Sequence, residues 1–214
     1  MLDKLLIGGL LILATTKSRQ TGKSSRSIRV IDSASLPVGA HRARLVAHEA
    51  GHAIVAAQAT HVRQLIEARV VMSGSQSHVR YDIRPSTMVD PWEALTVSVA
   101  GLAGEALAFG EVLRGSIGYA ENSGSDRAAI MLETAAIHTR HLPPPWSGPD
   151  DAGFNLGPLF ADASAVASTA SVAFGLAFTL LKGRSTKFRD LRQALDRKSC
   201  LDRYELARLV NTSY

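Results

Sequence analysis

The sequence predicts a mainly α-helical fold with a small β-hairpin or sheet. Aromatic residues make up only 6% of the chain, and alanine is abundant in the segments that have helical periodicity. Both features favour closely packed helices over a sheet-rich fold. With 214 residues, of which 46% are hydrophobic and 20% charged, the chain can bury one sizeable core, which excludes disordered and fibrous classes. We therefore expect one main domain.

The first 29 residues differ in composition from the rest. Residues 5–14 are apolar but about half as long as a bilayer-spanning helix, and residues 15–29 are rich in Ser, Thr, Lys and Arg without any periodicity. We predict an apolar N-terminal segment and a basic mobile linker over residues 1–29, followed by a folded domain over residues 30–214.

The domain is predicted to open with an amphipathic helix over residues 42–59. Two β-rich runs follow, residues 66–72 and 78–83, and the Ser-Gly-Ser turn at residues 73–75 separates them, as in a hairpin. We expect this small sheet to lie near the first helix.

A second helix is predicted from Pro91 to Phe109. Asp90 can cap it, Pro91 suits the first helical position, and Glu93 is placed to complete a capping box. Gly110 is expected to end this helix, because glycine readily adopts the backbone conformation of a helix C-terminus.

A third helix is predicted to begin after Ser123, to carry Asp126 in its first turn, and to end near His141. Residues 163–181 contain no charged side chain, and we interpret them as a buried core helix rather than a membrane span, because alanine and serine favour insertion only weakly. Two charged helices, residues 187–197 and 202–210, close the chain.

Charge and cysteine content limit the choice of partners and compartment. The net charge is +5, but no aromatic residue interrupts the arginines of residues 17–44, so we interpret them as a solvated arm and expect no nucleic acid partner. Cys200 is the only cysteine, which excludes an internal disulfide and a cysteine-based zinc knuckle. We expect a cytoplasmic protein and leave open a membrane contact through the N-terminal segment.

The clearest chemical signal is the H-E-x-x-H motif at residues 48–52. His48 and His52 lie one turn apart on one helix face, so both imidazoles can bind the same metal ion. Glu49 is rotated by about 100° from His48, which places its carboxylate beside the metal, where it can take a proton from water and pass it to a leaving amine. Gly51 is expected to leave room above the site.

A hydrolytic zinc site needs a third protein ligand and an open position for water. The sequence offers the candidates Glu105, Glu111, Glu121, Asp126, His138 and His141. Asp126 stands out, because the free backbone amides and the dipole of a helix N-terminus hold a first-turn carboxylate ionised and in place.

Several segments together resemble the FtsH family of zinc proteases. Residues 46–53, Val-Ala-His-Glu-Ala-Gly-His-Ala, look like the family's active-site helix. Residues 100–105 and 109–111 resemble its second helix, and residues 123–126 resemble the segment that supplies an aspartate ligand. The resemblance implies a helical zinc metallopeptidase domain.

The same resemblance implies a role for each matching residue. His48, His52 and Asp126 would bind Zn2+, Glu49 would be the catalytic base, and Glu105 would orient a ligand histidine. The implied activity is that of a metalloendopeptidase acting on unfolded polypeptides. The chain departs from the family pattern at Leu102, where an arginine is usual, and by about six extra residues before Asp126.

Family members also carry an AAA ATPase module before the protease, and this chain has only about forty residues there. We therefore expect hydrolysis without an ATPase of its own, and leave open a separate AAA ATPase partner and a homo-oligomer. Two alternatives to this interpretation also stay open. One is a thermolysin-like arrangement, with Glu121 as the third ligand and Asp126 orienting a histidine. The other is a catalytically inactive binding or regulatory module of the same fold.

Overall fold

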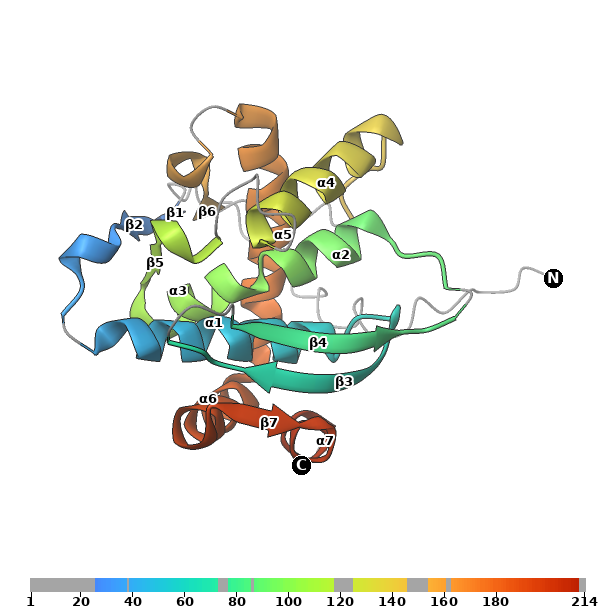
Figure 1. The fold of residues 1–214 in the computed structure, drawn as a ribbon. Coiled ribbons are helices and arrows are strands. Elements are labelled where there is room, and N and C mark those ends of the chain that lie inside the picture. Colours follow the sequence, from blue (N-terminus) through green and yellow to red (C-terminus); the bar gives the residue numbers. More distant parts are fainter. Residues whose placement is uncertain are drawn as a thin grey trace.

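The computed structural model describes residues 26–37, 39–72, 77–85, 87–117, 125–145, 154–160 and 163–211. Within these residues the fold is mainly helical, with a three-stranded sheet and two short pairs of parallel strands (Figure 1). The predicted fold class is confirmed at this level. The predicted apolar segment and most of the predicted linker lie outside the described residues.

The folded chain begins before the predicted domain boundary. β1 (Arg26–Ser27) pairs in parallel with β6 (Phe154–Asn155), and β2 (Arg29–Ile31) pairs in parallel with β5 (Glu111–Leu113). Ile28, between β1 and β2, is buried in the core. These residues therefore belong to the domain, because their backbone groups bond to strands much later in the chain, which no local sequence pattern reveals.

α1 (Ala40–Ala56) is the central helix of the fold, and it matches the helix predicted over residues 42–59. Every residue from Val46 to Ala56 is buried, which is typical of a helix covered on all sides. α1 packs against α3 (Ala100–Phe109), α6 (Ser185–Lys198) and the β-hairpin (Figure 1).

The three-stranded sheet has the order β4-β3-β7. β3 (Val62–Arg69) and β4 (His78–Ile83) form the predicted antiparallel hairpin, although β3 begins four residues earlier than the predicted run. β7 (Cys200–Asp202) pairs antiparallel with the end of β3 and was not expected from the sequence. Within the described residues β4 is therefore an edge strand.

The single helix predicted from Pro91 to Phe109 is in fact two helices, α2 (Pro91–Ser98) and α3, which meet at Val99. The hydroxyl groups of Thr96 and Ser98 donate to the carbonyls four residues earlier in α2. Such side-chain bonds to backbone carbonyls bend helices and account for the change of direction. Gly110 ends α3 with a φ of 73°, as predicted.

The start of α2 is only partly as predicted. Asp90 caps it by accepting a hydrogen bond from the backbone N–H of Trp92. Glu93 does not complete a capping box: its carboxylate instead accepts from the N–H and hydroxyl of Thr60 and from His61 Nδ1. These three donors occupy the Glu93 carboxylate, which a capping box would use for the N–H of Asp90. They also connect α2 to the turn that follows α1.

α4 (Asp126–Thr139) and α5 (Ser164–Gly183) pack against each other and against α2 (Figure 1). Ser125 caps α4, not Ser123, which lies outside the described residues. α5 contributes buried residues from Ala167 to Leu181 to the core, as predicted. Among the described helices it is also the one long and apolar enough to cross a membrane, and 44% of its most apolar stretch is buried in this fold.

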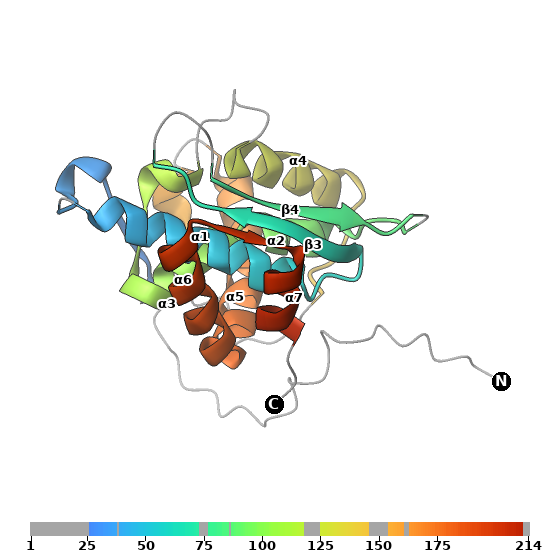
Figure 2. The same cartoon turned by 60° about the horizontal axis from the view of Figure 1, so that its bottom comes forward.

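The chain closes with α6, β7 and α7 (Arg203–Asn211), which lie beside α1 and β3 (Figure 2). The Asp202 carboxylate accepts from the N–H groups of Tyr204 and Glu205, and the Glu205 carboxylate accepts from the N–H of Asp202, so the two residues form a capping box at the start of α7. Short 3-10 turns are formed by Ser33–Ser35, Arg114–Ile117 and Gly157–Leu159.

Candidate metal centre

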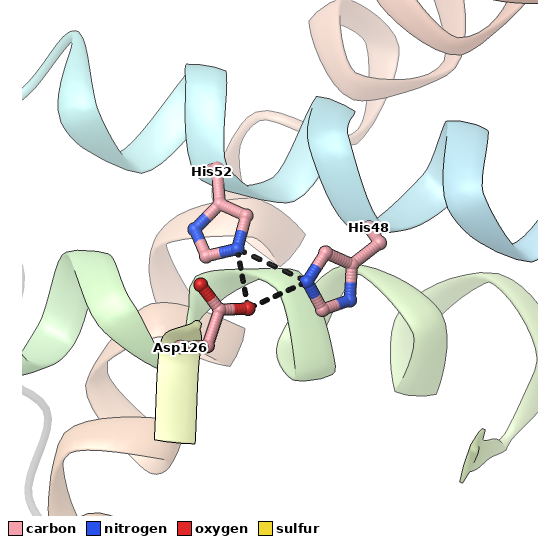
Figure 3. A group of neighbouring side chains, drawn as sticks. All are labelled: His48, His52 and Asp126. Atoms are coloured by element: carbon pink, nitrogen blue, oxygen red, sulfur yellow. Dashed lines mark hydrogen bonds and ion pairs between the residues drawn. The ribbon is translucent and has the colours of Figure 1, made fainter. Parts of the chain in front are cut away.

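His48 and His52 project from α1 toward the same point (Figure 3). Their Nε2 atoms lie 3.1 Å apart, and both side chains are buried. The one-turn spacing of the two residues produces this arrangement, because residues four apart share a helix face.

Asp126 completes the group from α4. Its Oδ2 lies 2.8 Å from Nε2 of His48 and 3.1 Å from Nε2 of His52 (Figure 3). Asp126 is the first residue of α4, directly after Ser125, whose hydroxyl accepts from the N–H of Ala128. The N-terminus of α4 therefore delivers the carboxylate to the two histidines.

The other ring nitrogen of each histidine is also bonded. Nδ1 of His48 lies 2.8 Å from Oε1 of Glu105 on α3, and Nδ1 of His52 lies 2.8 Å from the carbonyl oxygen of Val97 on α2. Because a carboxylate and a carbonyl can only accept, each Nδ1 carries the proton, and Nε2 faces Asp126. Such contacts orient imidazoles that bind metals.

Three glycines allow α3 to approach α1 this closely. A Cβ at Gly104 would lie 2.3 Å from the carbonyl oxygen of Ala47, and a Cβ at Gly51 would lie 2.3 Å from that of Ala100. Gly51 therefore serves the contact between the two helices, whereas the sequence led us to expect free space above the site. A Cβ at Gly101 would overlap the ring of His48, so the imidazole occupies the place of that side chain.

Arg44 supplies a buried positive charge behind the site. Its guanidinium pairs with Glu111 and lies 3.6 Å from Oε2 of Glu105, which also accepts from the N–H of Leu113 at 2.9 Å. Glu105 is completely buried and Arg44 nearly so. Leu102, where the resembled family has an arginine, lies in the apolar core, so the guanidinium beside Glu105 comes from α1.

His48, His52 and Asp126 shift one another's pKa values. Burial by itself would lower the pKa of His48, but hydrogen bonds to Asp126 and Glu105 outweigh it and raise that pKa well above its usual value. The pKa of His52 is also raised, because the attraction of Asp126 outweighs burial. Burial would raise the pKa of Asp126, but the two histidines together lower it strongly.

Glu49 stands beside this group and has a different environment. It is 4% exposed, and burial raises the pKa of its carboxyl, while the neighbouring His48 and His52 lower it in part. A carboxylate with a raised pKa is a better acceptor for a proton near neutral pH than an ordinary surface glutamate.

The donor atoms of these three side chains could hold one metal ion. One atom from each of His48, His52 and Asp126 lies within 4.8 Å of the others. Their 2.8 to 3.1 Å separations approach the ~3.3 Å expected between ligands about 2 Å from a tetrahedral ion. Two imidazoles and a carboxylate also match the ligand classes of hydrolytic zinc sites, which keep a fourth position open.

Among the described residues, the other candidate ligands from the sequence do not join the group. Glu111 pairs with Arg44, and His138 bonds to Thr169 at the far end of α4. His141 follows α4 in a left-handed backbone conformation, and Glu121 lies outside the described residues. Asp126 faces Nε2 rather than Nδ1 of both histidines, on the side opposite the contacts of Glu105 and the Val97 carbonyl.

Sequence reasoning missed two supports of the site. Arg44 lies one turn before His48 on the same face of α1. A charged residue in that position on a buried helix could have indicated from the sequence that a charged partner lies behind the site. The carbonyl of Val97 left no signal, because a backbone contact depends only on where α2 bends.

No protein-family model matches the chain, and no curated protein matches it. The similarity to FtsH-type proteases therefore stays a prediction from the motifs.

Proposed function

We propose that the chain is a zinc-dependent metalloendopeptidase with an FtsH-like helical peptidase domain. His48, His52 and Asp126 would hold the zinc ion, and Glu49 would be the catalytic base. One observation carries this proposal: the two motif histidines and the first residue of α4, an aspartate from a distant segment, converge on one point, with Glu49 buried beside them.

The chemistry divides between the ion and the chain. Zinc, when bound, would act as a Lewis acid that activates a water molecule and polarises the scissile carbonyl. Glu49 would take the proton from the attacking water and pass it to the departing nitrogen. Glu105 and the carbonyl of Val97 would hold the two imidazoles in the tautomer that directs Nε2 inward.

The sheet next to α1 supports an extended, unfolded polypeptide as the substrate. β4 is an edge strand within the described residues and contacts α1, which carries the motif. A free strand edge can pair with the backbone of an extended peptide. Folded substrates rarely expose such an extended peptide, whereas unfolded ones do. Hydrolysis would then need no ATPase in this chain, although a separate ATPase or a homo-oligomer could deliver substrate.

Glu49→Gln tests the proposal, because glutamine keeps the size of the side chain but cannot accept the proton. We expect casein hydrolysis to fall by about two to four orders of magnitude, the usual contribution of a positioned acid-base group, with zinc content and thermal stability unchanged. Added ATP should leave the wild-type rate unchanged. Glu205→Gln, on α7, is the matched control and should keep full activity.

Each other outcome has a definite meaning. Undiminished hydrolysis in Glu49→Gln would remove Glu49 from the mechanism, and loss of zinc would instead make the role of Glu49 structural. A wild-type protein that holds zinc but leaves unfolded casein intact would be a binding or regulatory module instead of a peptidase.

A further inference from the structure

Glu133 lies on the same face of α4 as Asp126, the third member of the candidate metal centre. It follows Asp126 by seven positions, close to two helical turns, and therefore lies about 10 Å further along the helix. Its side chain is partly buried, and within the part of the chain that the structure describes its carboxylate has no hydrogen bond or ion pair. The carboxylate can therefore bind a group from outside the chain.

Tyr81, on the edge strand β4, lies between that strand and the two carboxylates of α4. Burial raises the pKa of the Tyr81 phenol, and the negative charges of Glu133 and Asp126 raise it further. Such an effect requires both carboxylates to be near the phenol, because water and salt screen distant charges. The ring of Tyr81 packs toward the core and meets that of His61 edge to face, with the centroids 6.3 Å apart.

The other charged groups near Glu133 do not neutralise it. Burial raises the pKa of the Glu133 carboxyl, and His61 and Arg140 only partly offset this. Nδ1 of His61 bonds to Glu93 at 2.7 Å, and Arg140 forms no ion pair among the described residues. A partly buried carboxylate without a partner gains when a cation approaches it. The region beside Tyr81 therefore favours a positively charged group.

The direction of β4 indicates which part of a bound peptide would meet Tyr81. β4 and α4 run in the same general direction (Figures 1 and 2). Burial raises the pKa of Glu49, and His78, at the start of β4, is among the groups that lower it, so the start of the strand lies nearer the proposed base. A peptide that pairs antiparallel with β4, the more stable arrangement, would run from Ile83 toward His78. Its residues before the cleaved bond would therefore lie against Tyr81.

A lysine or arginine side chain fits this position. Its apolar stem can lie along the ring of Tyr81, and its charged head lies about 6 Å from its own Cα, which covers much of the distance from the metal centre to Glu133. We propose that Glu133 and Tyr81 select a basic residue on the N-terminal side of the cleaved bond, one or two positions before it. This inference rests on the proposed peptidase function and adds a substrate preference to it.

The cut sites in casein test this preference. When the fragments released by the wild-type protein are mapped by mass spectrometry, lysine or arginine should be enriched at the two positions before the cut. In peptides copied from one such site, norleucine in place of the basic residue keeps the stem without the charge. We expect this change to lower kcat/KM about fivefold, and glutamate at the same position to lower it further.

Variants of Glu133 assign the preference to this carboxylate. In Glu133→Gln the ratio of kcat/KM for the lysine and norleucine peptides should fall to about one, because the charge is removed and the shape is kept. In Glu133→Lys the glutamate peptide should become better than the lysine peptide. Glu205→Gln makes the same chemical change on α7, away from the site, and should keep the wild-type ratio.

The outcomes separate this inference from the proposed function. Equal rates for the lysine and norleucine peptides, or a preference that survives in Glu133→Gln, would overturn the inference and leave the proposed peptidase activity intact. Enrichment of basic residues after the cut instead of before it would overturn it as well.

If the wild-type protein cleaves neither casein nor peptides, the proposed function fails and a binding measurement decides. Fluorescein-labelled short peptides of alanine and serine, with one central lysine or norleucine, are titrated with the zinc-loaded protein and followed by fluorescence polarisation. Tighter binding of the lysine peptide that is lost in Glu133→Gln would support selection of a basic residue by Glu133. Equal binding of the two peptides, or no binding, would overturn it.

Discussion

The two sides of the candidate metal centre are held in different ways. On the α1 side, His48 and His52 are buried, and each has its second nitrogen bonded to a neighbouring helix. On the α4 side, the side chain of Asp126 is 26% exposed and arrives at the very start of its helix. One side is built into the core, and the other is docked against it.

Because of this difference, we expect substitutions on the histidine side to affect both folding and metal binding, and substitutions on the aspartate side to affect mainly metal binding. The histidine side rests on buried charge and glycine contacts, so damage there should unfold the protein as well as empty the site. The aspartate side rests on one helix terminus, so damage there should empty the site while leaving the core intact. Three substitutions on the histidine side, in order of decreasing effect, test this distinction.

Arg44→Met should have the largest effect on stability. Removing the guanidinium leaves Glu105 and Glu111 without their buried positive partner, and breaking a buried ion pair from one side typically costs about 3–5 kcal/mol. Urea unfolding at pH 7 measures the loss. Arg189→Met is the control, because Arg189 is largely exposed and its ion pair with Asp190 should contribute about 0.5 kcal/mol or less.

If Arg44→Met were as stable as the control, the positive charge of Arg44 would not be needed to stabilise the buried carboxylate of Glu105. The histidine side would then be held by packing alone, and the second substitution would become the stronger test.

Gly104→Ala should destabilise the fold by about 2–3 kcal/mol, because the added methyl group meets the backbone carbonyl of Ala47 and forces α1 and α3 apart. Zinc affinity should fall with it, since Glu105 moves with α3. Gly183→Ala, in α5, adds the same methyl group into open space and should be neutral or slightly stabilising. Equal thermal midpoints for the two variants would refute the close-approach argument.

Glu93→Gln probes α2, whose Val97 carbonyl holds His52, and should have the smallest effect. Burial would raise the pKa of Glu93, but hydrogen bonds from His61 and Thr60 outweigh it and lower that pKa. The ionised carboxylate therefore stabilises the fold above its unfolded pKa of about 4.5, and this contribution is lost as pH falls through the lower folded value.

We expect Glu93→Gln to cost about 1 kcal/mol at pH 7. The gap between wild type and variant should close below about pH 4. Thermal unfolding across this pH range measures it. A constant gap at every pH would show that packing of the side chain, and not its charge, ties α2 to the end of α1.

The sequence was sufficient where the determining contacts are local. The periodicity around residues 42–59, the hairpin near residues 66–83 and the paired histidines depend on neighbours within a few residues, and all of them appear in the structure. Asp126 was selected because a helix N-terminus favours a carboxylate, which is also a local argument.

Contacts between distant segments were beyond that reasoning. The pairing of β7 with β3 joins residues more than a hundred positions apart, and nothing in Cys200–Asp202 marks it as a strand. The use of the Glu93 carboxylate by His61 depends on how α2 meets the turn that follows α1. In each case tertiary packing overrode a valid local signal.

Zinc content in wild type and in two single variants tests the central claim most directly. After incubation with equimolar zinc and desalting, elemental analysis should find one ion per wild-type chain and almost none in His48→Ala or Asp126→Ala. Asp126→Ala should nevertheless stay folded and unfold in one cooperative urea transition. His138→Ala, at the far end of α4, should retain zinc. Stoichiometric zinc in Asp126→Ala, or none in the wild type, would contradict the assignment of these three residues as the metal ligands.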